Sequence, residues 1–288
     1  MPEPGVGEAV VRVRAAGICH SDVHYRAGTS PVAHLPITPG HEVAGEVAAV
    51  GAGVRSVREG DRICVHYLAT CGECEYCLSG REHFCRSGAM MGKHRDGGFA
   101  EYVLMPARSL VPLPDEIGFD AGAVMMCSSS TSLHALRVGR LQAGETVAVF
   151  GAGGLGQSAV QLARALGALA VYAVDIDAER LRLAEGSGAT AVNAAAGDPV
   201  AMIRQLTGGR GVDVALEVIG LPRTMRQAVQ SLAPMGRAVL AGITDRPLEL
   251  DSYRELIGRE AAVMGSSDHL RSELDLLLAL ARRGSLDL

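Results

Sequence analysis

The amino-acid sequence predicts an α/β protein with two domains, an irregular β domain followed by a doubly wound parallel sheet. The chain has 288 residues, which is long enough for two hydrophobic cores. Short apolar runs separated by Gly and Pro turns fill its first part, whereas strand and helix patterns alternate from Thr146 onward. Many short strands indicate the β domain, and the alternation indicates parallel strands with helices on both faces.

Four short strands are expected in the first part. Residues 8–14 alternate in part and lead towards Cys19, and residues 42–50 form a second strand that ends in a Gly-Ala-Gly turn. Residues 61–67 and 98–106 are expected as strands on either side of a cysteine-rich segment. Few helical patterns interrupt them, so this part is read as a β domain.

The pattern of apolar residues changes near residue 120, and from there to residue 138 small and apolar residues recur at helical intervals. After that, apolar strands and amphipathic helices are expected to alternate, with strands at 146–150, 170–174, 212–218 and 237–242 and helices at 157–166, 178–185, 199–207 and 223–232. We expect a catalytic zinc-binding β domain over 1–127, a nucleotide-binding Rossmann domain over 128–265, and a segment over 266–288 that begins the return to the first domain.

Composition excludes several classes of protein. The chain is 48% hydrophobic and 20% charged, as in ordinary globular proteins, and its net charge of −5 argues against nucleic acid as a partner. Its longest apolar candidate, residues 274–281, is far below the roughly 20 residues of a membrane span. No targeting segment is recognised, and the thiols suit a reducing compartment, so we expect a cytoplasmic protein.

A metal site is indicated by four cysteines with the spacing C-x2-C-x2-C-x7-C, namely Cys71, Cys74, Cys77 and Cys85. Four thiolates complete a tetrahedral shell and leave no position for water, which is typical of structural zinc over the lobe 71–85. Disulfides would suit a short secreted chain instead. An iron–sulfur cluster usually has its fourth cysteine after three residues, followed by Pro. Four unrelated buried thiols are the remaining alternative.

A nucleotide site is indicated by an apolar strand that runs into G-x-G-x-x-G and then a helix, with Gly151, Gly153, Gly154, Leu155 and Gly156. The glycines allow a tight turn, close approach to a pyrophosphate and tight packing of helix on strand. Asp175 ends the next strand, where a carboxylate favours NAD over NADP, and Arg180 lies near the same edge. A glycine-rich turn without a ligand is the alternative.

Further motifs carry a family resemblance. Cys64 is read as a core residue, whereas Cys19 and the Gly40-His41-Glu42 segment are only suggestive by themselves. Together with the four-cysteine lobe and the glycine-rich loop, the pattern of Gly40, His41, Glu42, Gly45, Gly51 and Val54 and the run 96–102 resemble the zinc-dependent medium-chain alcohol dehydrogenases. The resemblance covers essentially the whole chain, and it implies a GroES-like first domain.

The resemblance also implies residue roles. Cys19, His41 and Cys127 would be ligands of a catalytic zinc that acts as a Lewis acid. The remaining roles are a proton acceptor, Ser21; its outlet, His24; a contact to the pyrophosphate, His20; a contact to the nicotinamide, Thr131; a partner that orients His41, Asp22; and an acidic neighbour of the metal, Glu42.

Each of these residues could have a purely structural role instead. Ser21 could cap a helix, Asp22 and Glu42 could pair with arginines, and His24 could be an exposed loop residue. The other histidines carry no motif and are expected to be structural or at the surface, namely His34, His66, His83, His94, His134 and His269.

The expected activity is that of an NAD-dependent zinc alcohol dehydrogenase, which converts a primary or secondary alcohol to an aldehyde or ketone and holds two zinc ions per chain. The alternatives are a polyol or amino-alcohol dehydrogenase and a truncated zinc- and NAD-binding protein without turnover, because relatives begin earlier and continue further than this chain. The segment 258–265 resembles the edge strand through which relatives pair, so a homodimer or homotetramer is expected.

Overall fold

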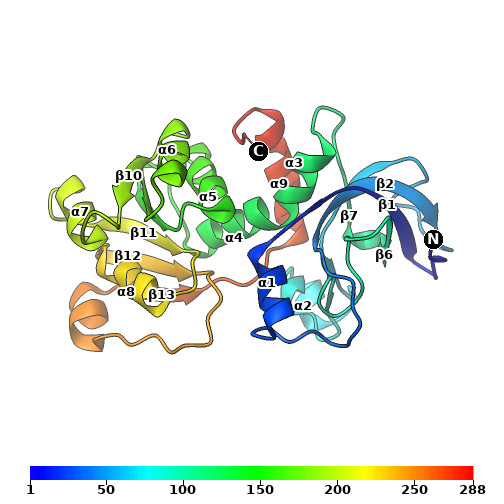
Figure 1. The fold of residues 1–288 in the computed structure, drawn as a ribbon, viewed down its shortest axis with the longest axis horizontal. Coiled ribbons are helices and arrows are strands. Elements are labelled where there is room, and N and C mark those ends of the chain that lie inside the picture. Colours follow the sequence, from blue (N-terminus) through cyan, green and yellow to red (C-terminus); the bar gives the residue numbers. More distant parts are fainter. Residues whose placement is uncertain (288) are drawn as a thin grey trace. The chain divides into compact units, whose positions relative to one another are not determined.

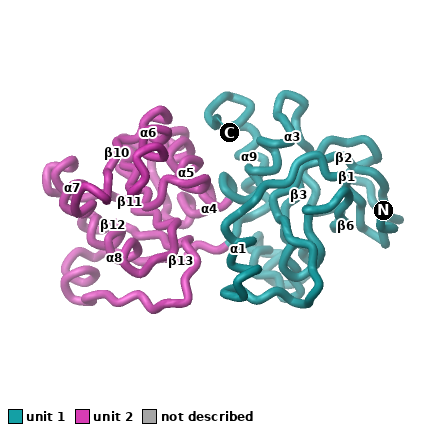
Figure 2. Tube along the Cα trace, viewed as in Figure 1, with its two compact units in different colours: residues 1–130, 268–288 teal, residues 131–267 magenta. Residues whose placement is uncertain are grey.

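The computed structural model describes residues 1–287. The chain divides into two compact units (Figure 2). Unit 1 contains Met1–Ser130 together with Asp268–Leu288, and unit 2 contains Thr131–Ser267. The end of the chain therefore returns to the unit in which the chain begins.

Unit 1 is built on an antiparallel five-stranded sheet with the order β6-β1-β2-β3-β7 (Figure 1). Its strands are β1 (Glu8–Gly17), β2 (Glu42–Val50), β3 (Arg62–Val65), β6 (Tyr102–Pro106) and β7 (Leu110–Pro112). Val11, Val43 and Met105 are fully buried in its core. The expected irregular β domain is confirmed.

Smaller elements surround this sheet. They are α1 (His20–Ala27), the hairpin β4 (Leu68–Ala69) and β5 (Ala89–Met90), α2 (Glu75–Leu78), the 3-10 helices η1 (Glu82–Phe84) and η2 (Ala107–Ser109), α3 (Phe119–Val124), the π-helical turn η3 (Met125–Ser129) and α9 (Arg271–Arg282). The helix α9 buries Leu274, Leu277 and Leu278 and contacts η3. Long-range packing thus places the last helix in unit 1.

The strand expected over 98–106 begins only at Tyr102. Gly98 donates a hydrogen bond to the carbonyl of Gly40 (2.8 Å), and Phe99 donates to that of Pro39 (3.1 Å). A Cβ atom on Gly97 would lie 2.3 Å from the Gly40 oxygen. Residues 97–99 therefore pack tightly against the segment before His41 rather than extending the strand.

Unit 2 contains a parallel six-stranded sheet with the order β10-β9-β8-β11-β12-β13. The strands are β8 (Thr146–Phe150), β9 (Ala170–Asp175), β10 (Thr190–Asn193), β11 (Val212–Glu217), β12 (Leu232–Leu240) and β13 (Ala262–Gly265). From β8, the strands β9 and β10 follow one another outward on one side, and β11, β12 and β13 follow outward on the other. The direction reverses between β8 and β11, which is the switch point at which such sheets bind ligands.

Helices cover both faces of this sheet, with α5 and α6 above it and α8 below it in Figure 1. The helices are α4 (Ser130–Val138), α5 (Gly154–Ala165), α6 (Ala178–Gly186), α7 (Pro199–Leu206) and α8 (Pro222–Gln230), with two short turns η4 (Ser252–Leu256) and η5 (Ile257–Arg259) before β13. The expected doubly wound parallel sheet is confirmed.

The single helix expected over 120–138 is divided into three parts. The α-helix α3 ends at Val124, the π-helical turn η3 follows, and α4 begins at Ser130. A π-helical turn inserts an extra residue per turn and is frequent at functional sites. Cys127 lies in its middle.

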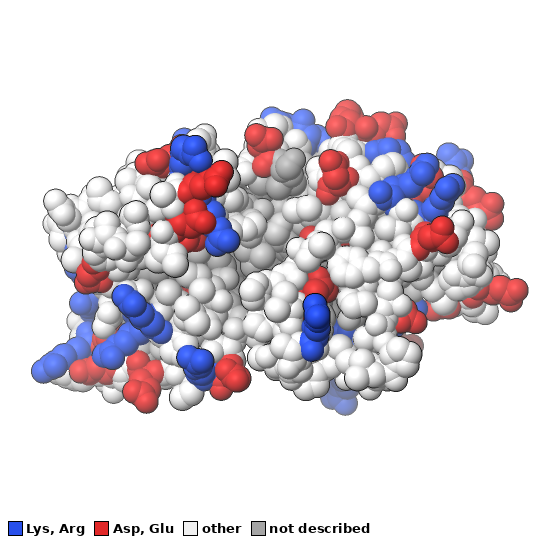
Figure 3. Space-filling model, in the orientation of Figure 1, with Lys and Arg blue, Asp and Glu red and all other residues white. Residues whose placement is uncertain are grey.

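Within residues 1–287, no helix is long and apolar enough to cross a membrane. Lys and Arg side chains are interspersed with Asp and Glu on the face drawn in Figure 3. No single sign of charge dominates that face.

Candidate active site

Four potential metal ligands from distant parts of unit 1 converge. The donor atoms of Cys19, His41, Glu42 and Cys127 all lie within 4.8 Å of one another. Cys19 is the N-cap residue of α1, and Cys127 lies in η3. Glu42 begins β2, and His41 directly precedes it. The sulfurs of Cys19 and Cys127 are 3.8 Å apart although 108 positions separate them in the sequence.

The imidazole of His41 is fully buried and faces Asp22. His41 Nδ1 lies 3.4 Å from Asp22 Oδ1, and Asp22 Oδ2 accepts a hydrogen bond from the backbone N–H of Cys19 (3.0 Å). Within the described residues, His41 Nε2 has no hydrogen-bond partner. A buried imidazole nitrogen rarely stays unsatisfied, so its place beside two thiols fits a metal ligand whose ring Asp22 orients.

The charges of this group favour a bound cation. Hydrogen bonding from Cys127, with a further contribution from His41, lowers the pKa of Cys19 to about 4 despite burial. Burial disfavours a charged His41, but the neighbouring Asp22 carboxylate and Cys19 thiol raise its pKa to about 10. Burial, helped by the charge of Cys19, raises the pKa of Glu42 to about 7. In this arrangement the negative charge of Cys19 is balanced by a proton on His41. A zinc ion could balance it instead, because sulfur and imidazole donors suit that metal.

Glu42 stands inside this group, although the sequence made it only a neighbour of the metal. It begins β2 and pairs with Gly17 of β1. A Cβ atom on Gly17 would lie 2.0 Å from Glu42 Oε2, so the glycine leaves room for the carboxylate. The carboxylate therefore lies among the donor atoms of Cys19, His41 and Cys127.

The four-cysteine lobe forms a second convergent group. The sulfurs of Cys71, Cys74, Cys77 and Cys85 also lie within 4.8 Å of one another, and three of the pairs are separated by 3.5, 3.9 and 4.0 Å. Sulfurs about 2.3 Å from one zinc ion lie about 3.8 Å apart at the corners of a tetrahedron. The seven cysteines are all free thiols, and backbone N–H groups of Cys71 and Cys74 point at sulfurs of the lobe. The spacing thus fits a closed tetrahedral site.

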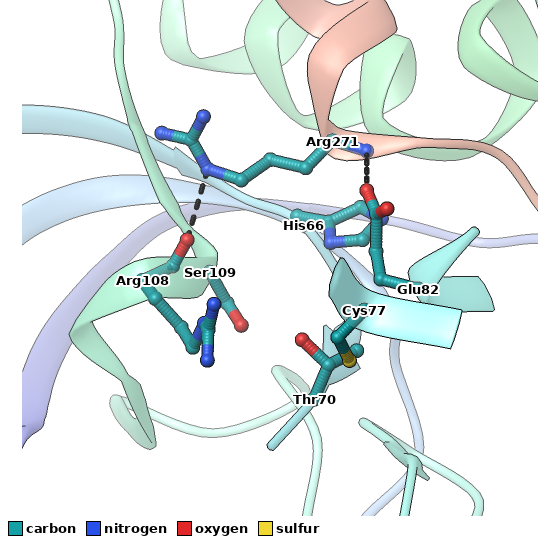
Figure 4. Close-up of a pocket in the computed structure, with 7 residues that line it drawn as sticks. All are labelled: His66, Thr70, Cys77, Glu82, Arg108, Ser109 and Arg271. Carbon is teal, nitrogen blue, oxygen red and sulfur yellow. Dashed lines mark hydrogen bonds between the residues drawn. The ribbon is translucent and has the colours of Figure 1, made fainter. Parts of the chain in front are cut away.

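A cavity of about 140 Å³ lies beside this lobe (Figure 4). Its wall is formed by His66, Thr70, Cys77, Glu82, Arg108, Ser109 and Arg271. Cys77 belongs to the four-cysteine group, but no residue of the wall belongs to the group around His41. The cavity is therefore a feature of the lobe and not of the candidate catalytic centre.

The expected proton-relay residues follow Cys19 on α1. Ser21 Oγ lies 3.6 Å from Cys19 Sγ. The rings of His20 and His24 are in edge-to-face contact, with centroids 5.1 Å apart. His20 is exposed and His24 is half-buried, so both rings are accessible to solvent. Because Cys19 is the N-cap, capping does not explain Ser21.

The glycine-rich loop of unit 2 connects β8 to α5. Gly151 has a φ of +104°, which other residues rarely adopt. A Cβ atom on Gly156 would lie 1.8 Å from the Gly151 oxygen, whereas one on Gly153 would meet no atom within 4 Å. Gly156 thus permits close packing of α5, and Gly153 faces open space at the helix start, where a pyrophosphate fits.

Asp175 ends β9 and also holds this loop in place. Its carboxylate accepts hydrogen bonds from the backbone N–H groups of Ala152 (2.7 Å), Ile176 (2.8 Å) and Asp177 (3.0 Å). A carboxylate has about four acceptor positions, so one remains for a ribose hydroxyl. The role in ordering the loop was missed, because the contact with Ala152 spans 23 positions in the sequence.

The remaining nucleotide residues lie around this loop. Gly154 and Leu155 open α5, and the carbonyl of Leu155 accepts a hydrogen bond from Ser132 of α4 (2.8 Å). Thr131 is half-buried at the start of α4. The exposed guanidinium of Arg180 lies 3.7 Å from the carboxylate of Asp177 and not on Asp175. His20 belongs to unit 1, and its contact with a cofactor stays a prediction.

Sequence reasoning missed one residue that packs against the group formed by Cys19, His41, Glu42 and Cys127. The ring of Tyr67 is 98% buried and meets the ring of His41 edge to face, with centroids 5.5 Å apart. Tyr67 stands two residues after the end of β3, within the stretch 61–67 expected as a strand, so no local pattern could have revealed its contact with His41. His269, which the sequence predicts to be structural or at the surface, is fully buried, and its ring centroid lies 4.8 Å from that of Tyr67.

Comparison with known proteins agrees with this geometry. Residues 5–115 match the family described as alcohol dehydrogenase GroES-like domain, and residues 154–282 match zinc-binding dehydrogenase. An alcohol dehydrogenase of Geobacillus stearothermophilus is 38% identical over 98% of this chain and 83% of its own length. An NAD-dependent alcohol dehydrogenase of Sulfurisphaera tokodaii is 33% identical over 99% of this chain and 84% of its own length.

A solved structure is also similar over the full chain. A protein of Sinorhizobium meliloti 1021, described as a zinc-binding dehydrogenase and solved with NADP, has a TM-score of 0.92 and 35% identity. The match covers 100% of this chain and 84% of that one. The chain belongs to the zinc-dependent medium-chain alcohol dehydrogenase family.

Proposed function

We propose that this chain is an NAD-dependent oxidoreductase that transfers hydride from a primary or secondary alcohol to the nicotinamide, giving an aldehyde or ketone. The observation that carries the proposal is the convergence of Cys19, His41 and Cys127 within 4.8 Å in a chain that also contains an ordered G-x-G-x-x-G loop. A thiol-rich metal group and a dinucleotide loop together suit redox chemistry on a small alcohol.

The proposal includes two zinc ions per chain. Cys19, His41 and Cys127 would hold the catalytic ion, and Cys71, Cys74, Cys77 and Cys85 would hold the structural one. Each group of donors lies within 4.8 Å, which supports this assignment. When bound at the first group, zinc supplies a Lewis acid that lowers the pKa of an alcohol hydroxyl. Glu42, whose carboxylate lies within 4.8 Å of these donors, would be an acidic neighbour of the ion.

Proton movement is assigned to the first turns of α1. Ser21 Oγ, which lies 3.6 Å from Cys19 Sγ, would accept the proton of the substrate hydroxyl. His24, half-buried and one turn further along the helix, would pass it to water. Asp22 would hold His41 in one tautomer, since its Oδ1 lies 3.4 Å from Nδ1.

Cofactor binding is assigned to the loop after β8. The open side of Gly153 and the start of α5 would receive the pyrophosphate, and Asp175 would receive a ribose hydroxyl. The negative charge of Asp175 would repel a 2′-phosphate, so NAD is proposed as the preferred cofactor. The relative solved with NADP makes this preference a point to measure.

Assembly and location are part of the proposal. The strand β13 stands at the edge of its sheet, which supports pairing with β13 of a second copy in a homodimer or homotetramer. Six of the seven cysteines would bind metal as reduced thiolates and the seventh, Cys64, is buried, which supports a cytoplasmic location.

The test is NADH formation by the zinc-loaded protein over a panel of primary, secondary, polyhydric and amino alcohols. Turnover with a simple alcohol that is lost in Cys127→Ser supports the proposal and identifies the substrate class. Wild-type protein that retains both metals yet reduces no NAD with any alcohol of the panel would refute it. The same assay with NADP measures the cofactor preference.

A further inference from the structure

The chain re-enters unit 1 at Asp268, beside the candidate catalytic centre. Asp268 has a φ of +52°, in the left-handed region that few residues other than glycine adopt. Its Oδ1 accepts a hydrogen bond from the hydroxyl of Tyr67 (3.1 Å). The ring of Tyr67 meets that of His41 at 87°. A continuous contact therefore runs from the re-entry point to one proposed zinc ligand.

The next residue contacts a second proposed ligand. His269 Nδ1 lies 3.1 Å from Ser130 Oγ, and this hydroxyl donates to the carbonyl of Cys127 (3.2 Å). A hydroxyl has one proton, so when Ser130 donates to Cys127 it accepts from His269. The tautomer of His269 that carries a proton on Nδ1 thus fixes Ser130 against the π-helical turn.

The contact between Ser130 and His269 is closed to solvent, and that between Tyr67 and Asp268 is partly buried. Ser130, His269 and His41 are fully buried, and Tyr67 is 2% exposed. The rings of Tyr67 and His269 also meet edge to face at 4.8 Å, which joins the two contacts. Water cannot readily replace a lost partner between Ser130 and His269, and on the Tyr67 side the buried ring leaves its hydroxyl little freedom, so each hydrogen bond restricts the orientation of its group.

We propose that Asp268 and His269 are positioning residues for the catalytic metal. Asp268 holds Tyr67 against His41, and His269 holds Ser130 against the backbone of Cys127. Two of the three proposed ligands are thereby set from a segment more than 100 positions away in sequence. This inference rests on the proposed function, since it assigns these residues to its catalytic ligands.

Substitutions can separate this role from a backbone effect. Asp268→Gly removes the acceptor and also relieves the left-handed backbone, whereas Asp268→Asn keeps an acceptor oxygen and tolerates the same φ. Tyr67→Phe removes only the hydroxyl. Tyr102→Phe is the matched control, because Tyr102 lies in β6 of the same unit, outside the metal group.

The measurement is the visible absorption of the cobalt-substituted protein together with kcat and KM. We expect Asp268→Gly and Tyr67→Phe to shift the cobalt–thiolate bands and to lower kcat 10- to 100-fold, as is typical when a group that orients a metal ligand is lost. The KM for NAD should stay within twofold. Asp268→Asn and Tyr102→Phe should match wild type, and the double variant Tyr67→Phe/Asp268→Gly should be no worse than either single variant.

A parallel series tests the second contact. Ser130→Ala should shift the bands in the same way, whereas His269→Asn, which keeps a donor near Nδ1, should retain most of the activity. Variants with wild-type spectra and kcat would overturn the inference, as would a loss of thermal stability without any spectral change. Failure of wild type to turn over any alcohol would refute the proposed function instead, while the spectral comparison would still test the positioning of the metal.

Discussion

The carboxylate of Glu82 accepts a hydrogen bond from the backbone N–H of Arg271 at 2.8 Å (Figure 4). Glu82 lies in η1, between the third and fourth cysteines of the lobe, and Arg271 is the first residue of α9. The lobe therefore places a negative charge at the N-terminus of a helix that follows it by 189 positions. A carboxylate at this position satisfies an unpaired N–H and interacts favourably with the helix dipole.

Glu82→Ala should destabilise the zinc-loaded protein by about 1 kcal/mol, because α9 loses this partner. The melting temperature should fall by about 2–4 °C for a chain of this size. Glu59→Ala is the matched control, since Glu59 is an exposed residue on a turn of the same unit and should leave the melting temperature unchanged. Equal melting temperatures for both variants would contradict a capping role.

Cys77→Ser should remove one zinc ion per chain, since three thiolates no longer complete the tetrahedral shell of the lobe. Metal analysis of purified protein should fall from two zinc ions per chain to one. Cys64→Ser should retain both ions, because Cys64 is buried and donates to the carbonyl of Gly122 (3.3 Å) outside either group. Unchanged metal content in Cys77→Ser would disprove the structural assignment.

His66 should make the protein less stable in mild acid. Burial lowers its pKa to about 4, against the opposing influence of the His269 backbone and Glu82. Between its ordinary pKa of 6.5 and about 4, the unfolded chain binds a proton that the folded chain does not, so stability falls as pH decreases through this range. The loss between pH 7.5 and 5.5 is about 1.3 kcal/mol.

The check is urea unfolding of wild type and His66→Gln at both pH values. The variant removes the titrating group, so its stability should change less over this range than that of wild type by about 1 kcal/mol. Comparing the two proteins cancels the titration of the metal ligands, which both share. A pH dependence that is the same in both would show that His66 does not contribute.

Two glycines of the nucleotide loop should respond differently to alanine. A Cβ atom on Gly156 would lie 1.8 Å from the Gly151 oxygen, so Gly156→Ala forces α5 away from the loop and should destabilise the protein by about 1–3 kcal/mol. On Gly153 the same atom meets nothing within 4 Å. Gly153→Ala should therefore unfold like wild type but occupy space that the pyrophosphate needs, which weakens NAD binding at least tenfold.

Thermal unfolding and NAD titration of the two variants decide the matter. Wild-type NAD affinity in Gly153→Ala would show that the dinucleotide does not approach this glycine. Wild-type stability in Gly156→Ala would show that α5 can move without cost, against the close packing of the loop.

Local sequence patterns were enough to predict the features that depend on residues close together in the chain. The cysteine spacing from Cys71 to Cys85 brings four thiols together because a short loop can return each one to the same point. The strand, the glycines and the helix around Gly153 require a particular backbone, and few other residues allow it. For the same reason, alternating strands and helices predicted the parallel sheet.

Only the tertiary structure decided how distant residues meet. Cys127 could be joined to Cys19 and His41 by family resemblance but not by spacing, because the π-helical turn that carries it depends on packing and appears in the sequence as an ordinary helix. Tyr67, Asp268, His269 and Ser130 have no shared motif, since their hydrogen bonds join segments up to 201 positions apart. Sequence determined which chemical groups this protein contains, and long-range packing decided which of them meet around Cys19, His41 and Cys127.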